Sequence, residues 1–333
     1  MSPSRSKTSI RDVAREAGVS IASVSRVLNE GTGGVSAATR TKVEKAIADL
    51  DYSPNWIGQA LRGQANNTFA MVISSIQNNF YSAVAWELER RLNDVGAAML
   101  LFNSNEDAAL QDRCLEEIRS RQVAGVFMLC AVDSPHLRSL SAHTPTVFIN
   151  RRIQDMPQIP FVGIDDRSAA RELARGVLRD HDGRIALVHG PRRSITSLSR
   201  LEGFREEFAA GGRPVPATDE IEAELSMESG YACAERLLGR AGGPGYAAIV
   251  CGNDQIAYGV YRRCRELGLR VPEDVAVYGF DDNPLNQWLA PWLNTVRVPH
   301  IRYAEAAIDT MRQLQQDAPA QDTILPYDLV LRR

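Results

Sequence analysis

Short apolar segments that alternate with longer amphipathic segments over residues 68–278 place the strongest constraint on the fold of this chain. The runs Thr68–Ser75, Val123–Leu129 and Ala247–Val250 have the length of a buried strand. The amphipathic segments between such runs have the length of a helix. Strands that alternate with helices predict parallel sheets with helices on both faces. The alternation therefore predicts an α/β body built from doubly wound parallel sheets.

The alternation falls into two series, which predicts a body of two similar lobes. The first lobe is expected at about residues 66–164 and the second at about 165–294. A C-terminal segment, with a strand at Thr323–Leu331, is expected to cross back. Ligands of open α/β sheets bind at the carboxyl ends of the strands. The cleft between the lobes is therefore the expected ligand site of residues 66–333.

Composition narrows the class of protein further. Hydrophobic residues make up 44% and charged residues 24% of the 333 residues, as in soluble globular proteins. The longest apolar runs are shorter than the ~20 residues of a membrane span, and no signal peptide is visible. The five cysteines form no Cys-x-x-Cys pair, which argues against a disulfide framework or a zinc site. We expect a cytoplasmic protein without a membrane segment, metal or cofactor.

Charge is distributed unevenly along the chain. The net charge is −3, which taken alone argues against a nucleic-acid partner. Residues 1–62, however, contain nine Lys and Arg against six Asp and Glu, so this segment carries +3 and the remainder −6. A basic segment on an acidic body is typical of a chain whose end meets a polyanion, although solvated helices reach +3 by chance.

Residues 1–52 contain three short stretches with apolar residues at helical spacing. Gly18 between the first two can adopt the left-handed conformation of a helix stop, and Ser20 and Ser36 can cap the helices that follow. The expected helices are Ile10–Ala17, Ile21–Asn29 and Ala37–Leu50. Two helices joined by a tight glycine turn and held by a third match the DNA-reading helix-turn-helix. An ordinary three-helix subdomain is the alternative.

The amino-acid sequence of this segment favours the DNA-binding interpretation. The stretch Ile10–Asn29, which reads IRDVAREAGVSIASVSRVLN, resembles the N-terminal signature of the lactose-repressor (LacI/GalR) family of bacterial transcription regulators. Residues Val35–Arg40 and Leu50–Asn55 resemble the same family. The resemblance implies a helix-turn-helix head over residues 1–52, a hinge helix and linker over 53–65, and a two-lobed body similar to periplasmic sugar-binding proteins.

The second helix of the head supplies the candidate DNA contacts. Its N-terminal end enters a major groove in this docking mode. Arg26 is long enough for a bidentate contact to guanine, whereas Ile21 and Ala22 can meet only thymine methyl groups. A phosphate contact or an intramolecular ion pair is the alternative for Arg26. With the hinge residues, the candidate DNA-binding residues are Ser20, Ile21, Ala22, Ser25, Arg26, Asn29, Asn55 and Leu61.

The segment after Pro54 is expected to form a two-turn hinge helix. A helix this short is marginal alone in water, which suits a switch. The resemblance implies that two copies pack in the minor groove and that Leu61 wedges into the central base step. This chain has Gly58 and Gln59 where the family commonly has alanine and arginine, so the hinge should be harder to order. A plain linker with Leu61 packed on the body is the alternative.

Candidate effector contacts follow from strand ends and from family motifs. Arg200 lies in an Arg-x-x-Gly-Phe element and Asp254 in an Asn-Asp element, both of which the family has. Asn150 stands at a strand end where the family commonly has an acid. The full candidate set is Asn79, Phe80, Asn150, Arg200, Asp254 and Trp288. Helix capping and core packing are the alternative roles of such residues.

Enzyme motifs are missing from the sequence. No Gly-x-Gly-x-x-Gly follows a strand, and there is neither a Walker loop nor a Gly-x-Ser-x-Gly elbow. The five histidines show no metal-ligand spacing. The chain is therefore expected to be a dimeric repressor whose affinity for a pseudo-palindromic operator depends on a sugar or sugar derivative. A Rossmann-type enzyme with a helical head and a DNA-binding protein whose body only dimerises are the alternatives.

Overall fold

The computed structural model describes residues 8–28, 35–52, 67–239 and 245–332. The chain forms two compact units, residues 1–66 and 67–333, which we call the head and the body.

Three helices form the described part of the head: α1 (Ile10–Ala17), α2 (Ile21–Leu28) and α3 (Ala37–Asp49). Helix α1 ends at Gly18, whose φ of 65° is left-handed, as the sequence predicts. The predicted caps are also confirmed. The Ser20 hydroxyl accepts a hydrogen bond from the backbone N–H of Ser23 at 3.1 Å, and the Ser36 hydroxyl accepts one from that of Thr39 at 3.2 Å.

A small apolar core holds these helices together. It consists of valines and alanines from the three described helices together with Tyr52: Val13, Ala14, Ala17, Val24, Val27, Val43, Ala46 and Tyr52. The face of α2 opposite Val24 and Val27 stays at the surface. The head therefore buries one side of α2 and leaves the other available to a partner.

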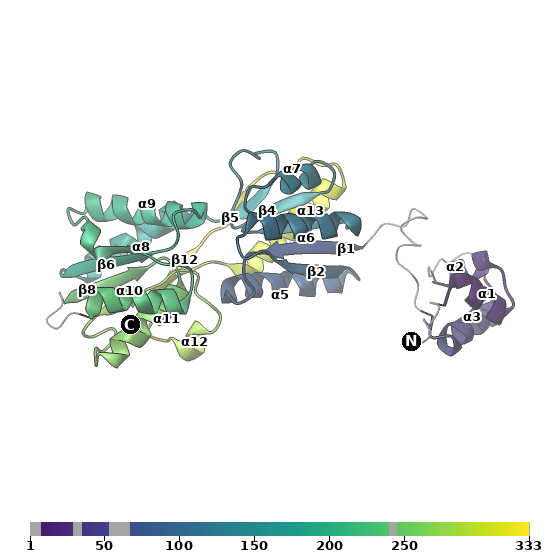
Figure 1. The fold of residues 1–333 in the computed structure, drawn as a ribbon, viewed down its shortest axis with the longest axis horizontal. Helices are drawn as coiled ribbons and strands as arrows, with labels where there is room; N and C mark the ends of the chain where they lie inside the picture. Colours follow the sequence, from purple (N-terminus) through teal and green to yellow (C-terminus); the bar gives the residue numbers. More distant parts are fainter. Residues whose placement is uncertain (1–7, 29–34, 53–66, 240–244, 333) are drawn as a thin grey trace. The chain divides into compact units, whose positions relative to one another are not determined.

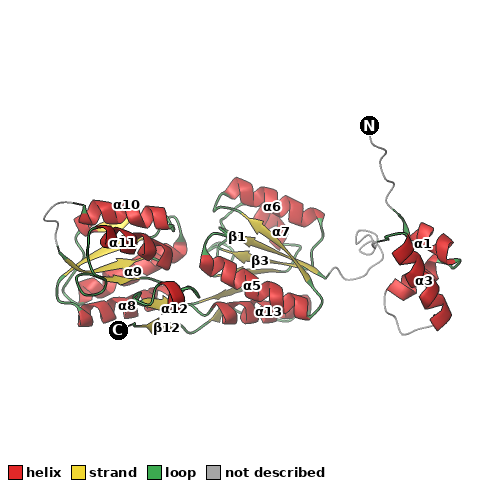
Figure 2. Ribbon diagram, turned by 90° about the horizontal axis from the view of Figure 1, so that it is seen from below, coloured by secondary structure: helices red, strands yellow, loops and turns green. Residues whose placement is uncertain are grey.

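The first lobe of the body is built on a six-stranded sheet of order β11-β5-β4-β3-β1-β2, in which all paired strands are parallel. Its strands are β1 (Thr68–Ile73), β2 (Ala98–Asn103), β3 (Gly125–Leu129), β4 (Thr146–Ile149), β5 (Phe161–Gly163) and β11 (Thr323–Ile324). Helices α5 (Asn79–Asp94) and α13 (His300–Gln315) pack on one face. Helices α6 (Ala108–Ser120) and α7 (Pro135–Ser141) cover the other (Figure 2).

The second lobe has a four-stranded parallel sheet of order β7-β6-β8-β9. Its strands are β6 (Arg184–His189), β7 (Glu220–Glu222), β8 (Tyr246–Cys251) and β9 (Ala276–Tyr278). Helices α8 (Asp166–Asp180) and α9 (Ile195–Ala210) pack on one face. Helices α10 (Met227–Leu238) and α11 (Asp254–Glu266) pack on the other (Figure 1). The predicted α/β architecture is therefore confirmed for both lobes.

The chain passes between the lobes three times. It leaves the first lobe between β5 and α8, and it returns between β10 (Thr295–Arg297) and α13. It then enters the second lobe again between β11 and β12 (Asp328–Val330), where β12 pairs antiparallel with β10. Three crossovers join the lobes closely while leaving the strand ends of both lobes facing the junction.

The C-terminal region differs from the prediction in two ways. The single strand expected at Thr323–Leu331 is two short strands in different sheets, β11 and β12. Pro326 lies between them, and a proline has no N–H to donate to a ladder. Helix α13 was not predicted, although Tyr303, Ala307 and Met311 recur at helical spacing and are buried. The short elements α7, β7, β10 and α12 (Asn286–Leu289) were not predicted either.

Candidate functional site

The exposed face of α2 presents three of the predicted DNA-binding side chains. Ile21, Ala22 and Arg26 are exposed, and Ser25 is half-buried. Arg26 makes no ion pair with any residue that the structure describes, so the ion-pair alternative for this residue is not observed. A guanidinium without an internal partner keeps all its donors for an external acceptor.

Ser20 stands at the N-terminal end of the same helix. Its oxygen caps α2 and lies 2.9 Å from the Ser23 hydroxyl. The capping bond uses the oxygen as an acceptor, and the Ser20 side chain remains exposed. The predicted contacts Asn29, Asn55 and Leu61, together with the hinge segment 53–65 and its Gly58 and Gln59, lie outside the described residues.

A cavity lies in the body where the ends of β4, β6, β8 and β9 meet the first turn of α5. We call it the effector cavity. Its lining residues come from both lobes: Asn78, Phe80, Tyr81, Asn150, Ser194, Thr196, Ser197, Arg200, Leu225, Asn253 and Asp281. In this arrangement of the lobes its volume is about 10 Å³, room for about one water molecule, so a larger ligand requires the lobes to separate. Three predicted effector residues, Phe80, Asn150 and Arg200, therefore line one cavity.

Arg200 is the centre of a buried charge network in this cavity. Its Nε donates to Asp166 Oδ1 at 2.7 Å, and its Nη1 donates to Asp281 Oδ1 at 3.1 Å and to the Gly252 carbonyl at 3.0 Å. The guanidinium also lies over the Phe280 ring at 3.7 Å. Burial lowers the pKa of Arg200, but the two carboxylates outweigh it and raise the pKa above its ordinary value. The arginine therefore stays charged and fixed.

The two carboxylates respond to the same burial. Burial raises the pKa of Asp166 against the opposing effect of Arg200. It raises the pKa of Asp281 to about 7, because Arg200 compensates only part of the desolvation and Asp254 and Asp166 add negative charge nearby. Asp281 also has a φ of 115°, which non-glycine residues rarely adopt. A strained carboxylate with a shifted pKa at a cavity wall is typical of a functional site.

Asn150 faces the cavity from the end of β4 in the first lobe. It has a φ of 64°, its side-chain nitrogen donates to Cys130 Sγ at 3.3 Å, and it is 5% exposed. Its Oδ1 has no hydrogen-bond partner among the described residues, although it is buried. An unsatisfied buried acceptor loses its hydration without compensation, so this oxygen is suited to meet a donor from a ligand.

Side chains already connect the two lobes beside this cavity. Arg151 donates from Nη2 to Glu106 Oε1 at 3.0 Å and to Ser194 Oγ at 2.8 Å in the second lobe. Thr196 of the second lobe donates to the Asn150 carbonyl at 3.2 Å. Gln255 donates across the junction to the Gln77 carbonyl at 3.0 Å. Relative movement of the lobes must therefore break or rearrange these bonds.

Asp254, expected to bind hydroxyl groups of an effector, lies within the second lobe in the structure. Its carboxylate accepts from Thr295 Oγ1 at 2.7 Å, the backbone N–H of Asn283 at 2.8 Å and Asn286 Nδ2 at 2.7 Å. It does not contribute to the effector cavity, because these bonds hold it against the 282–286 loop. The neighbouring Asn253 lines the cavity instead and caps α11 through Ile256.

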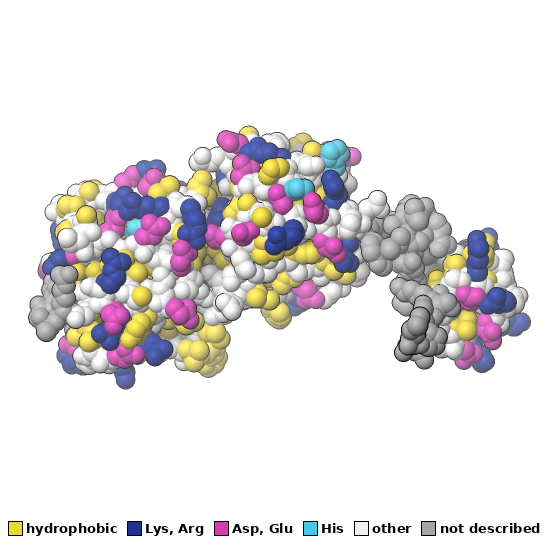
Figure 3. Space-filling view, viewed as in Figure 1, with side chains coloured by type: hydrophobic (Ala, Val, Ile, Leu, Met, Phe, Trp, Pro, Cys, Tyr) yellow, Lys and Arg dark blue, Asp and Glu magenta, His cyan; other side chains and the backbone are white. Residues whose placement is uncertain are grey.

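Asn79 and Trp288 also lie away from the effector cavity. Asn79 is the first residue of α5, and its neighbours Asn78 and Phe80 provide the cavity contacts. Trp288 on α12 is 75% exposed and lies with Leu285 and Leu289, which are 46% and 72% exposed. Together they form an exposed apolar patch on the visible face of the body (Figure 3). The Phe280–Trp288 loop thus contributes Phe280 beneath Arg200 but no aromatic wall from Trp288.

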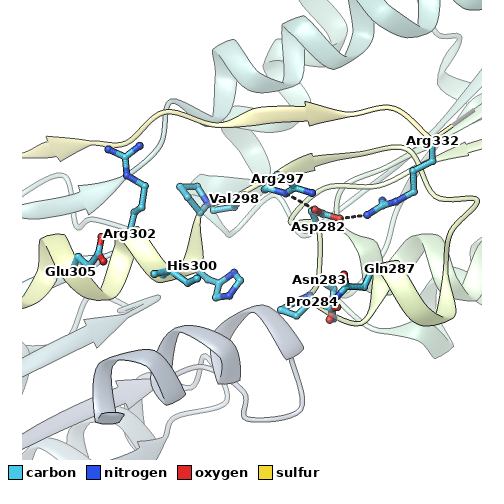
Figure 4. A pocket seen from close by; sticks show the side chains of 12 residues that line it. Asp282, Asn283, Pro284, Gln287, Arg297, Val298, His300, Arg302, Glu305 and Arg332 are labelled. Carbon is cyan, nitrogen blue, oxygen red and sulfur yellow. Dashed lines mark hydrogen bonds and ion pairs between the residues drawn. The ribbon is translucent and has the colours of Figure 1, made fainter. Parts of the chain in front are cut away.

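A second and larger cavity lies on another side of the crossovers. We call it the outer groove. Its volume is about 600 Å³, and its lining residues are Asp282, Asn283, Pro284, Gln287, Arg297–Arg302, Glu305 and Arg332. Asp282 lies between Arg297 Nε at 2.7 Å and Arg332 Nη2 at 2.6 Å (Figure 4). The groove shares no lining residue with the effector cavity.

The sequence has recognisable relatives along nearly its whole length. Residues 9–55 match the model of the "Bacterial regulatory proteins, lacI family", and residues 180–333 match a "Periplasmic binding protein-like domain". The ribose operon repressor of Escherichia coli is 32% identical over 309 residues, or 91% of each chain. The transcriptional regulator DegA of Bacillus subtilis is 33% identical over 98% of this chain and 97% of its own.

Solved structures show the same similarity. A lac repressor dimer bound to operator and the anti-inducer ONPF has a TM-score of 0.84 at 27% identity and covers 98% of each chain. A complex of the regulator CelR with cellobiose has a TM-score of 0.72 at 27% identity, with 98% of this chain and 99% of that chain covered. In the described parts of the body and head, no helix combines the length and apolar character that a bilayer crossing requires.

Proposed function

The chain belongs to the lacI family of bacterial regulatory proteins, and we propose that it represses transcription by binding an operator whose occupancy a small effector controls. The members of the family to which it is similar are transcription regulators and not enzymes. The observation that carries the proposal is the combination of an exposed α2 face in the head with a polar cavity between the two lobes of the body. We propose a cytoplasmic location, because operator DNA lies there.

The head is proposed to read DNA through α2. Ile21, Ala22 and Arg26 are exposed on α2, whose N-terminal end enters the major groove in this docking mode. Arg26 would bind guanine, and Ser20 and Ser25 would fix the register on phosphates. Asn29, Asn55 and Leu61 stay in the proposed contact set on the resemblance alone.

A symmetric dimer fits a pseudo-palindromic operator with one head on each half-site. The similar lac repressor structure is a dimer bound to operator. In this chain Leu285, Trp288 and Leu289 leave an apolar patch exposed on α12, and a second copy would remove that surface from water. The patch therefore supports a homodimer and gives Trp288 a role different from effector contact.

An uncharged sugar or sugar derivative is the proposed effector. The charged side chains that line the effector cavity, Arg200 and Asp281, are already paired with each other, so a ligand charge would have no free partner. Asn150 Oδ1 offers an acceptor to a hydroxyl, and Phe80 offers an apolar face. Names of similar proteins include ribose and cellobiose. We propose Phe80, Asn150, Asn253, Arg200 and Asp281 as the contacts.

Operator binding tests the function directly. Full-length protein is titrated with DNA from upstream of its own gene and with a scrambled duplex of the same length, in rising salt and with a panel of pentoses, hexoses and disaccharides. We expect specific binding about 10³-fold or more tighter than to the scrambled duplex, and one sugar that changes it. Equal, salt-governed binding to both duplexes would contradict the proposal.

A further inference from the structure

The outer groove is a large cavity on the described part of the body, and the proposed function assigns it no role. It lies between the 282–287 loop of the second lobe and the first turns of α13 in the first lobe, beside two of the three crossovers. A molecule in this groove would touch both lobes at once. A ligand bound there would therefore favour one arrangement of the lobes over another.

The charges of the groove favour an anion. Three arginines line it (Arg297, Arg302 and Arg332) against two carboxylates, and one of these, Glu305, is bound to Arg91 at 2.6 Å outside the groove. Arg302 is exposed on the first turn of α13 and makes no hydrogen bond or ion pair with another described residue. His300 stands two residues before it and also lines the groove. The first turn of α13 has no side-chain cap.

Within this groove the carboxylate of Asp282 already binds two of the arginines. Its carboxylate binds Arg297 of β10 and Arg332, which follows β12, so it joins two crossovers to the second lobe. It is 9% exposed. A carboxylate or phosphate from outside would compete with Asp282 for these guanidinium groups or share them.

The backbone links this groove to the effector cavity. Asp281 and Asp282 are consecutive and both have positive φ, 115° and 50°. The first binds Arg200 in the effector cavity, and the second binds Arg297 and Arg332 in the outer groove. Two adjacent non-glycine residues in this conformation are strained, and such strain collects at functional sites. A movement of the backbone at one aspartate should therefore shift the other.

We propose that the outer groove is a second ligand site, distinct from the effector cavity, which takes a small anionic metabolite bearing a carboxylate or phosphate group. Arg302 supplies the unpaired charge, and Arg297 and Arg332 supply donors shared with Asp282. The anion acts on the effector cavity through the Asp281–Asp282 pair.

Calorimetry on the full-length protein without DNA tests this site, with citrate and with inorganic phosphate as probes at constant ionic strength. We expect saturable binding of at least one probe, and the better probe identifies the group that the site prefers. Arg302→Gln should weaken binding about tenfold, because it removes the unpaired charge. Asp282→Asn should tighten binding, because it frees Arg297 and Arg332.

Arg312→Gln is the matched control, since Arg312 lies on the same helix, is exposed and pairs with Asp309 at 3.3 Å. It should leave anion binding unchanged. Absence of saturable binding for both probes, equal losses in the Arg302 and Arg312 variants, or weaker binding in Asp282→Asn would each overturn the proposal. Operator binding is measured on the same preparations, so failure of the groove site is distinguishable from failure of the proposed function.

Discussion

Arg26 on α2 and Arg200 on α9 are the two arginines on which the proposed activity depends most, and their surroundings are opposite. Arg26 is exposed and has no partner among the described residues. Arg200 is 6% exposed and donates to two carboxylates and a carbonyl. The head keeps its arginine free for an external partner, whereas the body has already incorporated its arginine into the fold.

In the head, the arginine that binds the partner is therefore not needed for folding. In the body, one arginine serves both ligand binding and stability. An exposed cation gains its partner only on binding, so its loss should change DNA affinity and leave folding unaffected. A buried cation compensates buried carboxylates, so its loss affects the folded state before any ligand is present.

The largest effect is expected for Arg200→Ala. The variant leaves Asp166 and Asp281 buried without their cation, so the free energy of unfolding should fall by about 3–5 kcal/mol, and effector binding should be lost. Denaturant titration and calorimetry measure the two effects. Arg175→Ala is the control: Arg175 is exposed on α8 and pairs with Glu207 of α9. Its loss should lower the free energy of unfolding by less than about 1 kcal/mol. Similar losses in both variants would break the contrast.

The next effect is a pH dependence of body stability that comes from Asp281. Its carboxyl has a pKa of about 7 when folded, against 3.8 for an ordinary aspartate, so the folded chain holds the proton over that interval while the unfolded chain releases it. Stability should therefore fall as pH rises from about 4 to about 7, by up to about 1.4 kcal/mol per pH unit.

Asp281→Asn checks this assignment. The variant has no proton to release at this position, so its stability should fall less steeply over the same interval. Asp254, whose pKa burial raises to about 6, contributes in the same direction and should leave part of the slope. An unchanged slope in thermal unfolding at several pH values would assign the effect to other groups.

Arg26→Ala should have a smaller effect, confined to DNA. Loss of one bidentate base contact should weaken operator binding by about 1–3 kcal/mol per half-site and relax specificity at one base pair. Effector affinity and unfolding should match the parent protein. Lys45→Ala is the control, because Lys45 is exposed on α3 and pairs with Asp49 at 3.0 Å. A drop in thermal stability of the Arg26 variant would contradict the proposed independence of binding and folding in the head.

The smallest effect is expected for Gly18→Ala. A Cβ at this residue meets no atom within 4 Å, so the cost comes from the left-handed φ of 65° alone and should be about 1 kcal/mol. Hydrogen exchange should show faster opening of head amides only. Faster exchange in the body as well would mean that the two units do not open separately.

The sequence predicts the head and the layered body well because local signals specify them. Gly18 and the serine caps mark helix ends, and the apolar runs of β1 and β3 have the length and character of buried strands. Short elements such as β7 and α12 were missed, because three or four residues hold no period and owe their conformation to neighbours. Helix α13 differs from these short elements, because its buried residues do recur at helical spacing and could have been predicted.

The effector cavity could be predicted only in part. Arg200 and Asn150 follow from motifs and a strand end, and both line the cavity. Asp254 was predicted to contact the effector, but in the structure it binds the 282–286 loop. Asn253 and Asp281 line the cavity instead. In the pair Asp281–Asp282, backbone torsions decide which carboxylate faces which cavity, and residue types do not encode those torsions in any simple pattern.

The sequence positions of α13 and β11 have a consequence for synthesis on the ribosome. These two elements complete the first lobe, yet they are translated only after the whole sheet of the second lobe. The head, by contrast, needs only residues near its own start. In a nascent chain the head should therefore fold before the body can bind an effector. The edge of β5 should stay unpaired, and accessible to chaperones, until residue 324 has left the ribosome.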